Sequence, residues 1–390
     1  MWSVAEFDQQ LRADACAAGH PMPVLDHAPV VEALVPVVVS ASRAGAAVTV
    51  EATGGGSPAS GTGEAALALL GRLGVSVAAD VPATLIVADS GTVAALAHLA
   101  RTSPVGGRHE PVAAMIGWWL DRVDFPGGLP VADVVATCRT RWVSGADPQA
   151  EQQVATWLAA HKVSAGGGLL DVLALHRLVS AGMPLVGLTE LADDTAWSFE
   201  AAQRAHIDGW DWRRPDTPGR AAVGLRARCD AADAYAAYLL NDARYRQRAA
   251  CGGIVVTGTL CRSAGQQSGP VIECERMDAR LRPGTDVTGW NGTAVDQLSS
   301  QFTATVHAAS VRHGRLNLTL SSLGAVPAGP GDSITVMPAP PIASRQRSGR
   351  AAYRRLYNHR RSWISTGKVP TITRRPVPLD VLVAAAERDD

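Results

Sequence analysis

The segment from residue 252 to residue 340 most constrains the fold, because it alternates apolar with polar residues in short runs. These runs are GIVVTGTLCR, PVIECERMDARL, SQFTATVHAASV, GRLNLTLSSL and DSITVMPA. Such alternation is typical of strands buried on one face, and Gly, Pro and Asn punctuate the gaps as turn residues do. The gaps are too short for the crossover helices that parallel strands require. We therefore expect a small antiparallel β-barrel of five or six strands.

Two helical segments flank these strands. The alanine-rich stretch LRARCDAADAYAAYLLNDARYRQRAA precedes them and predicts one long helix. The stretch IASRQRSGRAAYRRLYNHRR follows them, with Gly349 as a weak point. A proline-rich joint, RRPDTPG at residues 213–219, stands before the first helix. The expected unit is therefore helix, barrel, helix over residues 218–365, followed by a C-terminal tail over residues 366–390.

The first half of the chain predicts two further parts. Residues 1–108 alternate helical runs with apolar runs at LVPVVVSA, AAVTVEA, VSVAAD and TLIVADS, which indicates a small α/β domain with a parallel sheet. Residues 109–217 are helical and rich in tryptophan; Asp147 and Pro148 are expected to open one helix there. The predicted fold class is thus an α/β head, a helical middle and a small antiparallel β-barrel flanked by two long helices.

This barrel on two helices resembles the stalk-and-barrel accessory domain of superfamily 1B helicases of the nonsense-mediated-decay type. The matching part covers about residues 222–362, and the most suggestive stretch is LNLTLSSLGAVPAGPGDSITVMPAPPIASRQRSGRAAYRRL. In that family a motor with a complete P-loop follows the second stalk helix, whereas this sequence reaches Asp390 without one. The resemblance implies a barrel without its motor, and a helicase motor or another protein as a partner in trans. It transfers no functional residue.

The charge of the chain is divided unevenly, although its net value is zero. Residues 333–379 contain no acid, while ten arginine and lysine residues lie there. Residues 1–340 hold 25 basic and 32 acidic side chains, a net charge of −7. A basic C-terminal arm is therefore attached to a mildly acidic body.

The basic arm also carries aromatic residues, and arginines interleaved with aromatic rings are what single-stranded nucleic acid needs for phosphate neutralisation and base stacking. Duplex phosphates could use the same charges. The predicted partner is thus DNA or RNA, and an acidic protein surface is the alternative that would make the chain an adaptor. The candidate nucleic-acid-binding residues are Arg345, Arg347, Arg350, Tyr353, Arg354, Arg355, Tyr357, Arg360, Arg361, Trp363 and Lys368.

The stretch TGGGSPASGTGEAALALLGRLG at residues 53–74 raises a second possibility, a nucleotide site. A P-loop reads G-x-x-x-x-G-K-[ST], because backbone N–H groups wrap the phosphate and the lysine neutralises its charge. Gly56 and Gly61 have this spacing, but Thr62 stands where the lysine should be. The pattern therefore favours a glycine–serine loop that precedes a helix.

The same stretch also approximates the dinucleotide fingerprint. Gly61, Gly63 and Ala66 fit G-x-G-x-x-A, and Asp80 ends a candidate strand where a ribose-binding acid would stand. However, the glycines follow the preceding strand candidate too late, and Asp80 comes too early. A nucleotide- or dinucleotide-binding enzyme is accordingly the alternative function.

The sequence contains no motif for a metal site or for a catalytic site. Six scattered cysteines form no C-x-x-C pair and the histidines form no H-E-x-x-H motif, so no metal site is expected. No G-x-S-x-G motif or paired catalytic acids stand out, and no catalytic residue or cofactor is predicted. No apolar run reaches the length of a membrane span, and the N-terminus does not read as a signal peptide. We expect a cytoplasmic, non-enzymatic nucleic-acid-binding accessory protein.

Overall fold

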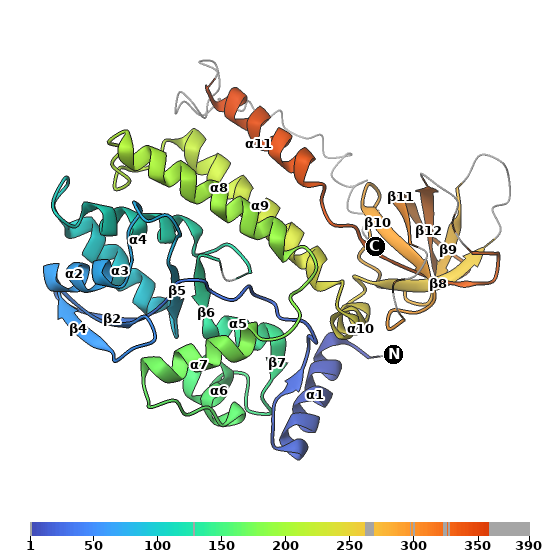
Figure 1. Ribbon diagram of the computed structural model, residues 1–390. Helices are drawn as coiled ribbons and strands as arrows, with labels where there is room; N and C mark the ends of the chain where they lie inside the picture. Colours follow the sequence, from blue (N-terminus) through green and yellow to red (C-terminus); the bar gives the residue numbers. More distant parts are fainter. Residues whose placement is uncertain are drawn as a thin grey trace, which may run out of the picture. The chain divides into compact units, whose positions relative to one another are not determined.

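The structure is a computed structural model (Figure 1), and it divides into two compact units. It describes residues 2–358, except 128, 262–268, 297, 299–300, 323–325 and 327. Unit 1 comprises Met1–Arg214 and Arg228–Ile342 and holds a sheet with its helices and a barrel. Unit 2 comprises Pro215–Ala227 and Ala343–Asp390.

A five-stranded mixed sheet forms the first layered part of unit 1, with the order β4-β3-β2-β5-β6. Its strands are β2 (Pro36–Ala44), β3 (Ala47–Thr53), β4 (Ala59–Thr62), β5 (Thr84–Val87) and β6 (Val131–Asp133). Strands β2, β5 and β6 run parallel, but β3 and β4 are antiparallel to their neighbours. The expectation of a parallel sheet was therefore wrong for β3 and β4. The tight turn at Gly45, with φ of 62°, can connect only antiparallel strands.

One expected strand does not form. The run VSVAAD makes turns between α2 and β5, with Val75 and Val77 buried in the core rather than paired in the sheet. These residues are buried but do not pair with a neighbouring strand, so a short apolar run can also form a packed loop. The sheet instead takes its fifth strand from β6, within the segment that was expected to be wholly helical.

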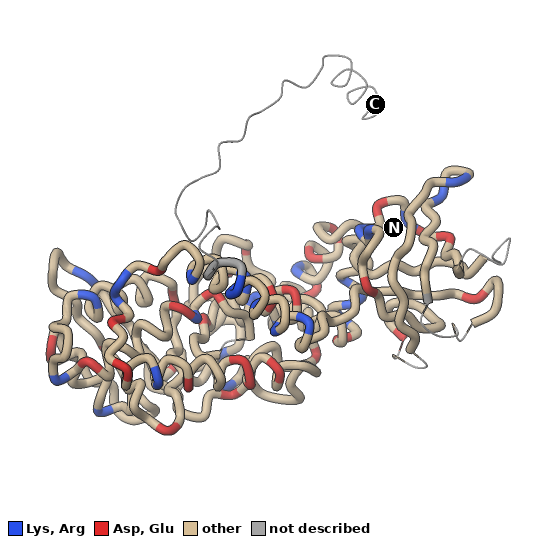
Figure 2. Tube along the Cα trace, turned by 90° about the horizontal axis from the view of Figure 1, so that it is seen from above, with Lys and Arg blue, Asp and Glu red and all other residues tan. Residues whose placement is uncertain are grey.

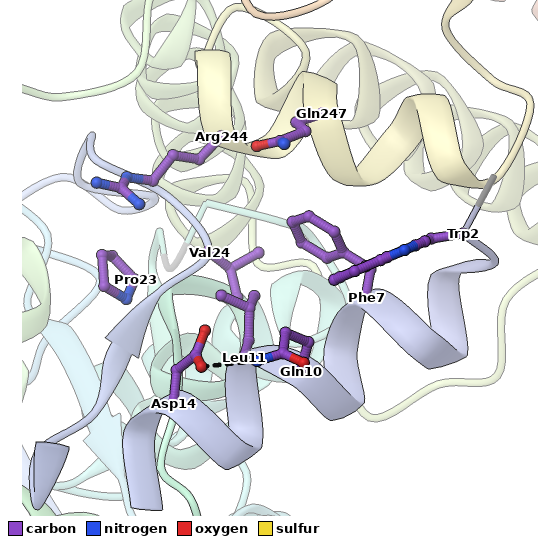
Figure 3. Close-up of a pocket in the computed structure, with 9 residues that line it drawn as sticks. All are labelled: Trp2, Phe7, Gln10, Leu11, Asp14, Pro23, Val24, Arg244 and Gln247. Carbon is purple, nitrogen blue, oxygen red and sulfur yellow. Dashed lines mark hydrogen bonds between the residues drawn. The ribbon is translucent and has the colours of Figure 1, made fainter. Parts of the chain in front are cut away.

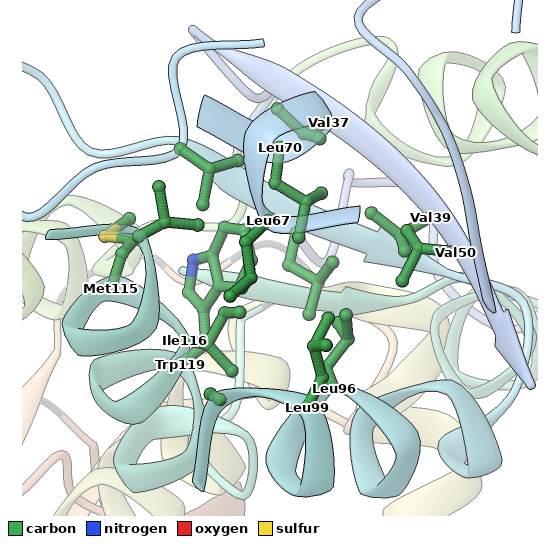
Figure 4. Close-up of a cluster of buried hydrophobic side chains, with 14 of the residues drawn as sticks. Val37, Val39, Val50, Leu67, Leu70, Leu96, Leu99, Met115, Ile116 and Trp119 are labelled. Carbon is green, nitrogen blue, oxygen red and sulfur yellow. The ribbon is translucent and has the colours of Figure 1, made fainter. Parts of the chain in front are cut away.

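Helices cover both faces of the sheet, as the pattern of the strands requires. Val37 and Leu85 contribute to one hydrophobic cluster, drawn in part in Figure 4, while Val38, Ile86 and Ala132 contribute to the cluster on the other face. Strands buried on both faces are expected to be apolar throughout. The helices are α2 (Glu64–Arg72), α3 (Ser90–Thr102), α4 (Glu110–Arg122), α5 (Val134–Arg141), α6 (Val154–His161), α7 (Leu169–Ser180) and α8 (Leu188–Ile207).

Tryptophans anchor these helices by packing in the core. Trp119 on α4 is buried and its Nε1 donates a hydrogen bond to the Ala83 oxygen at 3.0 Å. Trp157 on α6 is likewise buried and donates to the Glu151 oxygen at 2.9 Å. Each ring fills apolar space while its polar atom is satisfied. The helix expected to open at Asp147 is instead a short 3-10 turn, and α6 begins at Val154.

His176 on α7 is buried beside the second cluster, and neither of its ring nitrogens has a hydrogen-bond partner among the described residues. Burial disfavours the charged ring and lowers the pKa of His176 to about 4. The unfolded chain protonates His176 more readily than the folded chain does. The free energy of unfolding therefore decreases as the pH falls from about 6.5 towards 4.

We predict that His176→Leu removes the part of the pH dependence of the free energy of unfolding that comes from His176. In wild-type protein the free energy of unfolding should fall by about 3 kcal/mol across this pH range on account of His176. Urea unfolding at pH 4 and pH 7 should show a smaller difference in the variant, whereas His307→Gln, at an exposed position of the barrel, should behave as wild type. Parallel pH profiles for His176→Leu and wild type would contradict the prediction.

Two helices, rather than the single one expected, precede the barrel. Helix α9 (Pro218–Leu239) ends before a short break, and α10 (Ala243–Cys251) begins after it. Asp242 causes the break, because its side chain accepts hydrogen bonds from the backbone N–H groups of Arg244 and Tyr245. An aspartate with an extended backbone is a strong N-cap, and it starts a new helix rather than continuing the old one.

The barrel is closed, six-stranded and antiparallel, with the order β10-β11-β12-β9-β8-β13. The prediction of a small antiparallel barrel is confirmed. Side chains such as Ile272, Val306, Leu318 and Ile334 fill its interior. One strand, β10, had not been expected. The strands are β8 (Val256–Cys261), β9 (Val271–Cys274), β10 (Asp286–Asn291), β11 (Phe302–Arg312), β12 (Arg315–Ser322) and β13 (Ser333–Pro338).

Arg246 joins α10 to the barrel. Its side chain is 2% exposed, and its guanidinium donates to four backbone oxygens. Two belong to Leu240 and Asn241 in the helix break, and two belong to Ala294 and Asp296 in the loop after β10. A buried charge is tolerated only when it is hydrogen-bonded in this way.

We predict that Arg246→Met is strongly destabilising, because it leaves four buried carbonyls without their donor. The free energy of unfolding should fall by about 3 kcal/mol or more, as is typical when a buried charged partner is removed. The neighbouring Arg244→Met removes only an exposed ion pair to Asp26 and should cost less than about 1 kcal/mol. Urea denaturation compares the two, and equal losses would show that Arg246 is not special.

Helix α1 (Val4–Ala18) completes unit 1, and α11 (Ala343–Asn358) belongs to unit 2. Ser3 and Glu6 form a capping box that starts α1. Asp8 of α1 makes a two-bond ion pair with Arg248 of α10, at 2.6 and 2.7 Å. Helix α11 is the second of the two long helices expected on either side of the barrel sequence.

Candidate nucleic-acid interface

Five arginines and no acids lie on α11. At 3.6 residues per turn, Arg347, Arg350 and Arg354 fall within about 60° of one another around the helix axis. We call these three residues the basic face. Arg347 and Arg354 are exposed, and Arg350 is half-buried. The helix thus turns a linear arginine pattern into one cationic strip.

The remaining candidates on α11 lie outside the basic face. Arg345 and Arg355 are exposed on other sides of the helix, and the Tyr353 side chain is 39% exposed. The backbone of Tyr357 belongs to α11, but its side chain is outside the described residues. Arg360, Arg361, Trp363 and Lys368 also lie outside the described residues. The structure therefore places six of the eleven candidate side chains on one helix.

The charges of the rest of the chain are mixed. Figure 2 shows acidic and basic positions interspersed along unit 1. Many of them are paired; Arg213, for example, donates to both carboxylate oxygens of Glu110 at 2.9 Å. An interspersed surface of this kind does not attract a polyanion over a wide area. The concentration of one sign on α11 is therefore a local feature.

The glycine-rich stretch forms bends at residues 54–57 and then the edge strand β4. After β3, Thr53 Oγ1 donates to the Gly56 oxygen at 2.7 Å and accepts from the Gly55 N–H at 3.0 Å. The chain then returns as β4, in which Gly61 pairs with Val50. Within this stretch, the backbone of residues 59–62 is thus paired with β3 in the sheet.

The local backbone structure explains why residues 61 and 63 are glycines. A Cβ on Gly61 would come within 2.8 Å of the Ala65 backbone, because β4 approaches the start of α2 closely. Gly63 has a φ of 59°, a left-handed conformation that glycine adopts without strain. Asp80 lies in the turns between Val77 and β5 rather than at the end of a strand. The structure does not place Asp80 as the dinucleotide pattern requires.

A pocket of about 250 Å³ lies between α1, β1 (Met22–Pro23) and α10 (Figure 3). Its lining combines apolar side chains with amides and charged groups, and Gln10 Nε2 donates to Asp14 Oδ1 at 2.8 Å. No histidine or cysteine is among its lining residues in the described part of the chain. The lining residues are Trp2, Phe7, Gln10, Leu11, Asp14, Pro23, Val24, Arg244 and Gln247.

A histidine–aspartate pair lies near this pocket in sequence and was not predicted. His27 Nδ1 lies 2.8 Å from Oδ2 of Asp242, which also accepts from the backbone N–H groups of Asp26 and His27. These hydrogen bonds lower the pKa of Asp242 although burial opposes them. The ionised carboxylate only accepts, so Nδ1 of His27 carries the proton. The pair fastens residues 26–27 to the start of α10.

Other sites are not found among the described residues. They contain no group of three or more His, Cys, Asp or Glu side chains that could hold a metal ion, and all six cysteines are free. No helix in the described part of the chain is both long and apolar enough to cross a membrane.

Comparisons of the chain with protein-family models, with curated proteins and with solved structures found no match. What the chain does must therefore be inferred from its own residues.

We predict that the glycines at residues 53–63 serve folding. Gly61→Ala should lower the free energy of unfolding by about 1–3 kcal/mol, because its Cβ would overlap backbone that cannot move alone. Gly56→Ala, which meets nothing within 4 Å, is the matched control and should be nearly neutral. Neither ATP nor NAD should raise the melting temperature of the wild-type protein. A ligand-induced rise that Gly56→Ala abolishes would instead establish a nucleotide site.

Proposed function

We propose that the chain binds nucleic acid through the basic face of α11. The observation that carries this proposal is the presence of Arg347, Arg350 and Arg354 on one side of a helix that has no acidic residue. Like charges three and four residues apart repel one another along a helix. A polyanion that binds beside these three arginines is attracted to all of them at once.

The spacing of the basic face suits a phosphate backbone. With a rise of about 1.5 Å per residue, Arg347 and Arg354 are about 10.5 Å apart along the helix axis, with Arg350 between them. Phosphates recur along a nucleic-acid strand at similarly regular intervals, so several can be neutralised at once. Guanidinium groups are suited to this task, because their planar donors match phosphate oxygens in pairs.

The charge of the rest of the chain favours a confined contact. Residues 1–340 carry a net charge of −7, whereas the described α11 carries five positive charges. A polyanion is therefore repelled by most of the chain and attracted to one helix. This contrast supports a binding protein with a defined orientation on its ligand.

The architecture supports an accessory role. A closed barrel whose sequence lies between long helices resembles the accessory domain of superfamily 1B helicases, in which a separate part performs the chemistry. On this basis we propose a non-enzymatic protein that contacts DNA or RNA beside a helicase motor or another protein partner. Only architecture supports that partner, so it stays a prediction.

We predict that replacing all three arginines of the basic face with alanine weakens binding to every nucleic acid sequence alike. The logarithm of affinity should fall less steeply with the logarithm of salt, with the slope reduced by about 2 for single strands, from about 0.7 counterions per lost contact. Fluorescence anisotropy with labelled oligonucleotides, between 50 and roughly 200 mM salt, measures both quantities.

The matched control is Arg345→Ala with Arg355→Ala, which removes two charges of the same helix away from the basic face. Its salt slope should stay closer to that of wild type than the slope of the triple variant. If wild-type protein binds neither DNA nor RNA at low salt, the proposal fails. The basic face would then be assigned to an acidic protein surface.

A further inference from the structure

The β11–β12 hairpin ends in a tight, cationic turn. His313 and Gly314 are its two central residues, with φ of 51° and 72°. Positive φ at both positions defines a type I′ turn, which favours asparagine followed by glycine. On either side, Arg312 and Arg315 pair directly across the strands. The end of the hairpin thus presents two arginines and a histidine within four residues.

This end projects beyond the barrel. Strand β12 pairs with β9 only at residues 317–319, and β11 pairs with β10 only at residues 302–305. Val311 pairs with the buried Leu316 and so faces the core side, yet its side chain is 61% exposed. We call residues 309–316 the hairpin tip. Figure 2 shows a projecting hairpin with basic positions near its end.

The hairpin tip concentrates local features that cost stability. Like charges directly opposite each other in a strand pair are destabilising, which applies to Arg312 and Arg315. A histidine in the left-handed region is uncommon, although it is tolerated better than most residues. Just before the tip, the register shifts between Val306 and Ala308, and such a bulge redirects the strand beyond it. Costs gathered at an exposed tip point to a role in binding.

Charge at the hairpin tip is only partly compensated. Arg315 Nη1 lies 2.6 Å from Oε1 of Glu273 on β9, while the Arg315 side chain remains 65% exposed. Arg312 is exposed and has no hydrogen bond or ion pair with any residue that the structure describes. The tip therefore retains a net positive charge on a narrow two-stranded ribbon.

We propose that the hairpin tip enters the major groove of B-form duplex DNA. This groove is about 12 Å wide and admits a two-stranded β-ribbon, whereas the major groove of A-form RNA is too narrow for one. Arg312 and Arg315 then reach phosphates or base edges from the outer face of the ribbon. The inference rests on the proposed nucleic-acid binding by α11 and specifies its substrate as duplex DNA.

The test compares three labelled probes: a DNA duplex of about 20 base pairs, one of its single strands, and the RNA duplex of the same sequence. Full-length protein carrying Arg312→Ala and Arg315→Ala should bind the DNA duplex at least about tenfold more weakly. Binding of the single strand and the RNA duplex should change by less than about twofold. Arg43→Ala, an exposed arginine near the turn of the β2–β3 hairpin, is the matched control.

Two further variants separate binding from folding. Glu273→Gln removes the carboxylate beside Arg315 and should strengthen binding to the DNA duplex. Arg312→Ala alone leaves the Arg315–Glu273 pair intact and removes the like-charge pair. Its melting temperature should equal or exceed that of wild type while its affinity for the DNA duplex falls.

The possible outcomes distinguish this inference from the proposed function. Equal loss on all three probes, or no loss on the DNA duplex, overturns groove entry even when the basic face of α11 is needed for binding. If the wild-type protein does not bind the DNA duplex, groove entry is overturned; if it binds neither DNA nor RNA of any kind, the proposed function fails as well. Loss confined to the DNA duplex, with an unchanged or raised melting temperature, supports the tip as a groove-reading element.

Discussion

The second half of unit 1 depends on the hydrogen bonds that the buried guanidinium of Arg246 donates. The guanidinium donates hydrogen bonds to backbone oxygens of the break between α9 and α10 and of the loop after β10. Neither segment can therefore move without the other. The adjacent Asp242 accepts backbone N–H groups from residues 26–27 and starts α10. A break of three residues, 240–242, is thereby hydrogen-bonded to the barrel and to the loop after β1. What reads as a helix interruption is a packed junction with satisfied polar groups.

The sequence predicted the barrel because alternation along a strand records which face is buried, and that signal is local. It did not predict β10, in which Gly289 lacks a side chain and a Cβ there would overlap the Phe302 ring. Nor did it predict the antiparallel direction of β3 and β4, because alternation identifies a strand without identifying its neighbour. The helix break at Asp242 was missed for a related reason: alanine-rich propensity continued on both sides of one capping residue.

The candidate sites differ in how visible they are in a linear sequence. The arginines of α11 all lie between residues 345 and 355, and a helix alone brings three of them to one face. The pocket draws Phe7, Val24 and Gln247 from three distant segments, so no local pattern could indicate it. At Gly61 one residue type has two possible causes, because close packing against Ala65 demands a glycine just as a phosphate loop does. In the sequence, His313 and Gly314 indicate only a hairpin turn. The strand register shows that Arg312 and Arg315 lie directly opposite each other beside it.

Closure of the barrel also determines the order in which its ladders can be completed. Strand β13 lies between β10 and β8, and its residues are the last of the barrel to leave the ribosome. Until then, β8 and β10 each present an edge with unpaired N–H and C=O groups, and unpaired edges readily join other chains. Domains that depend on a late, distant strand remain exposed to misassembly during synthesis. Any polypeptide that stops before Ser333 would carry this open ring, and a quality-control chaperone that binds extended, half-apolar strands would have its target there.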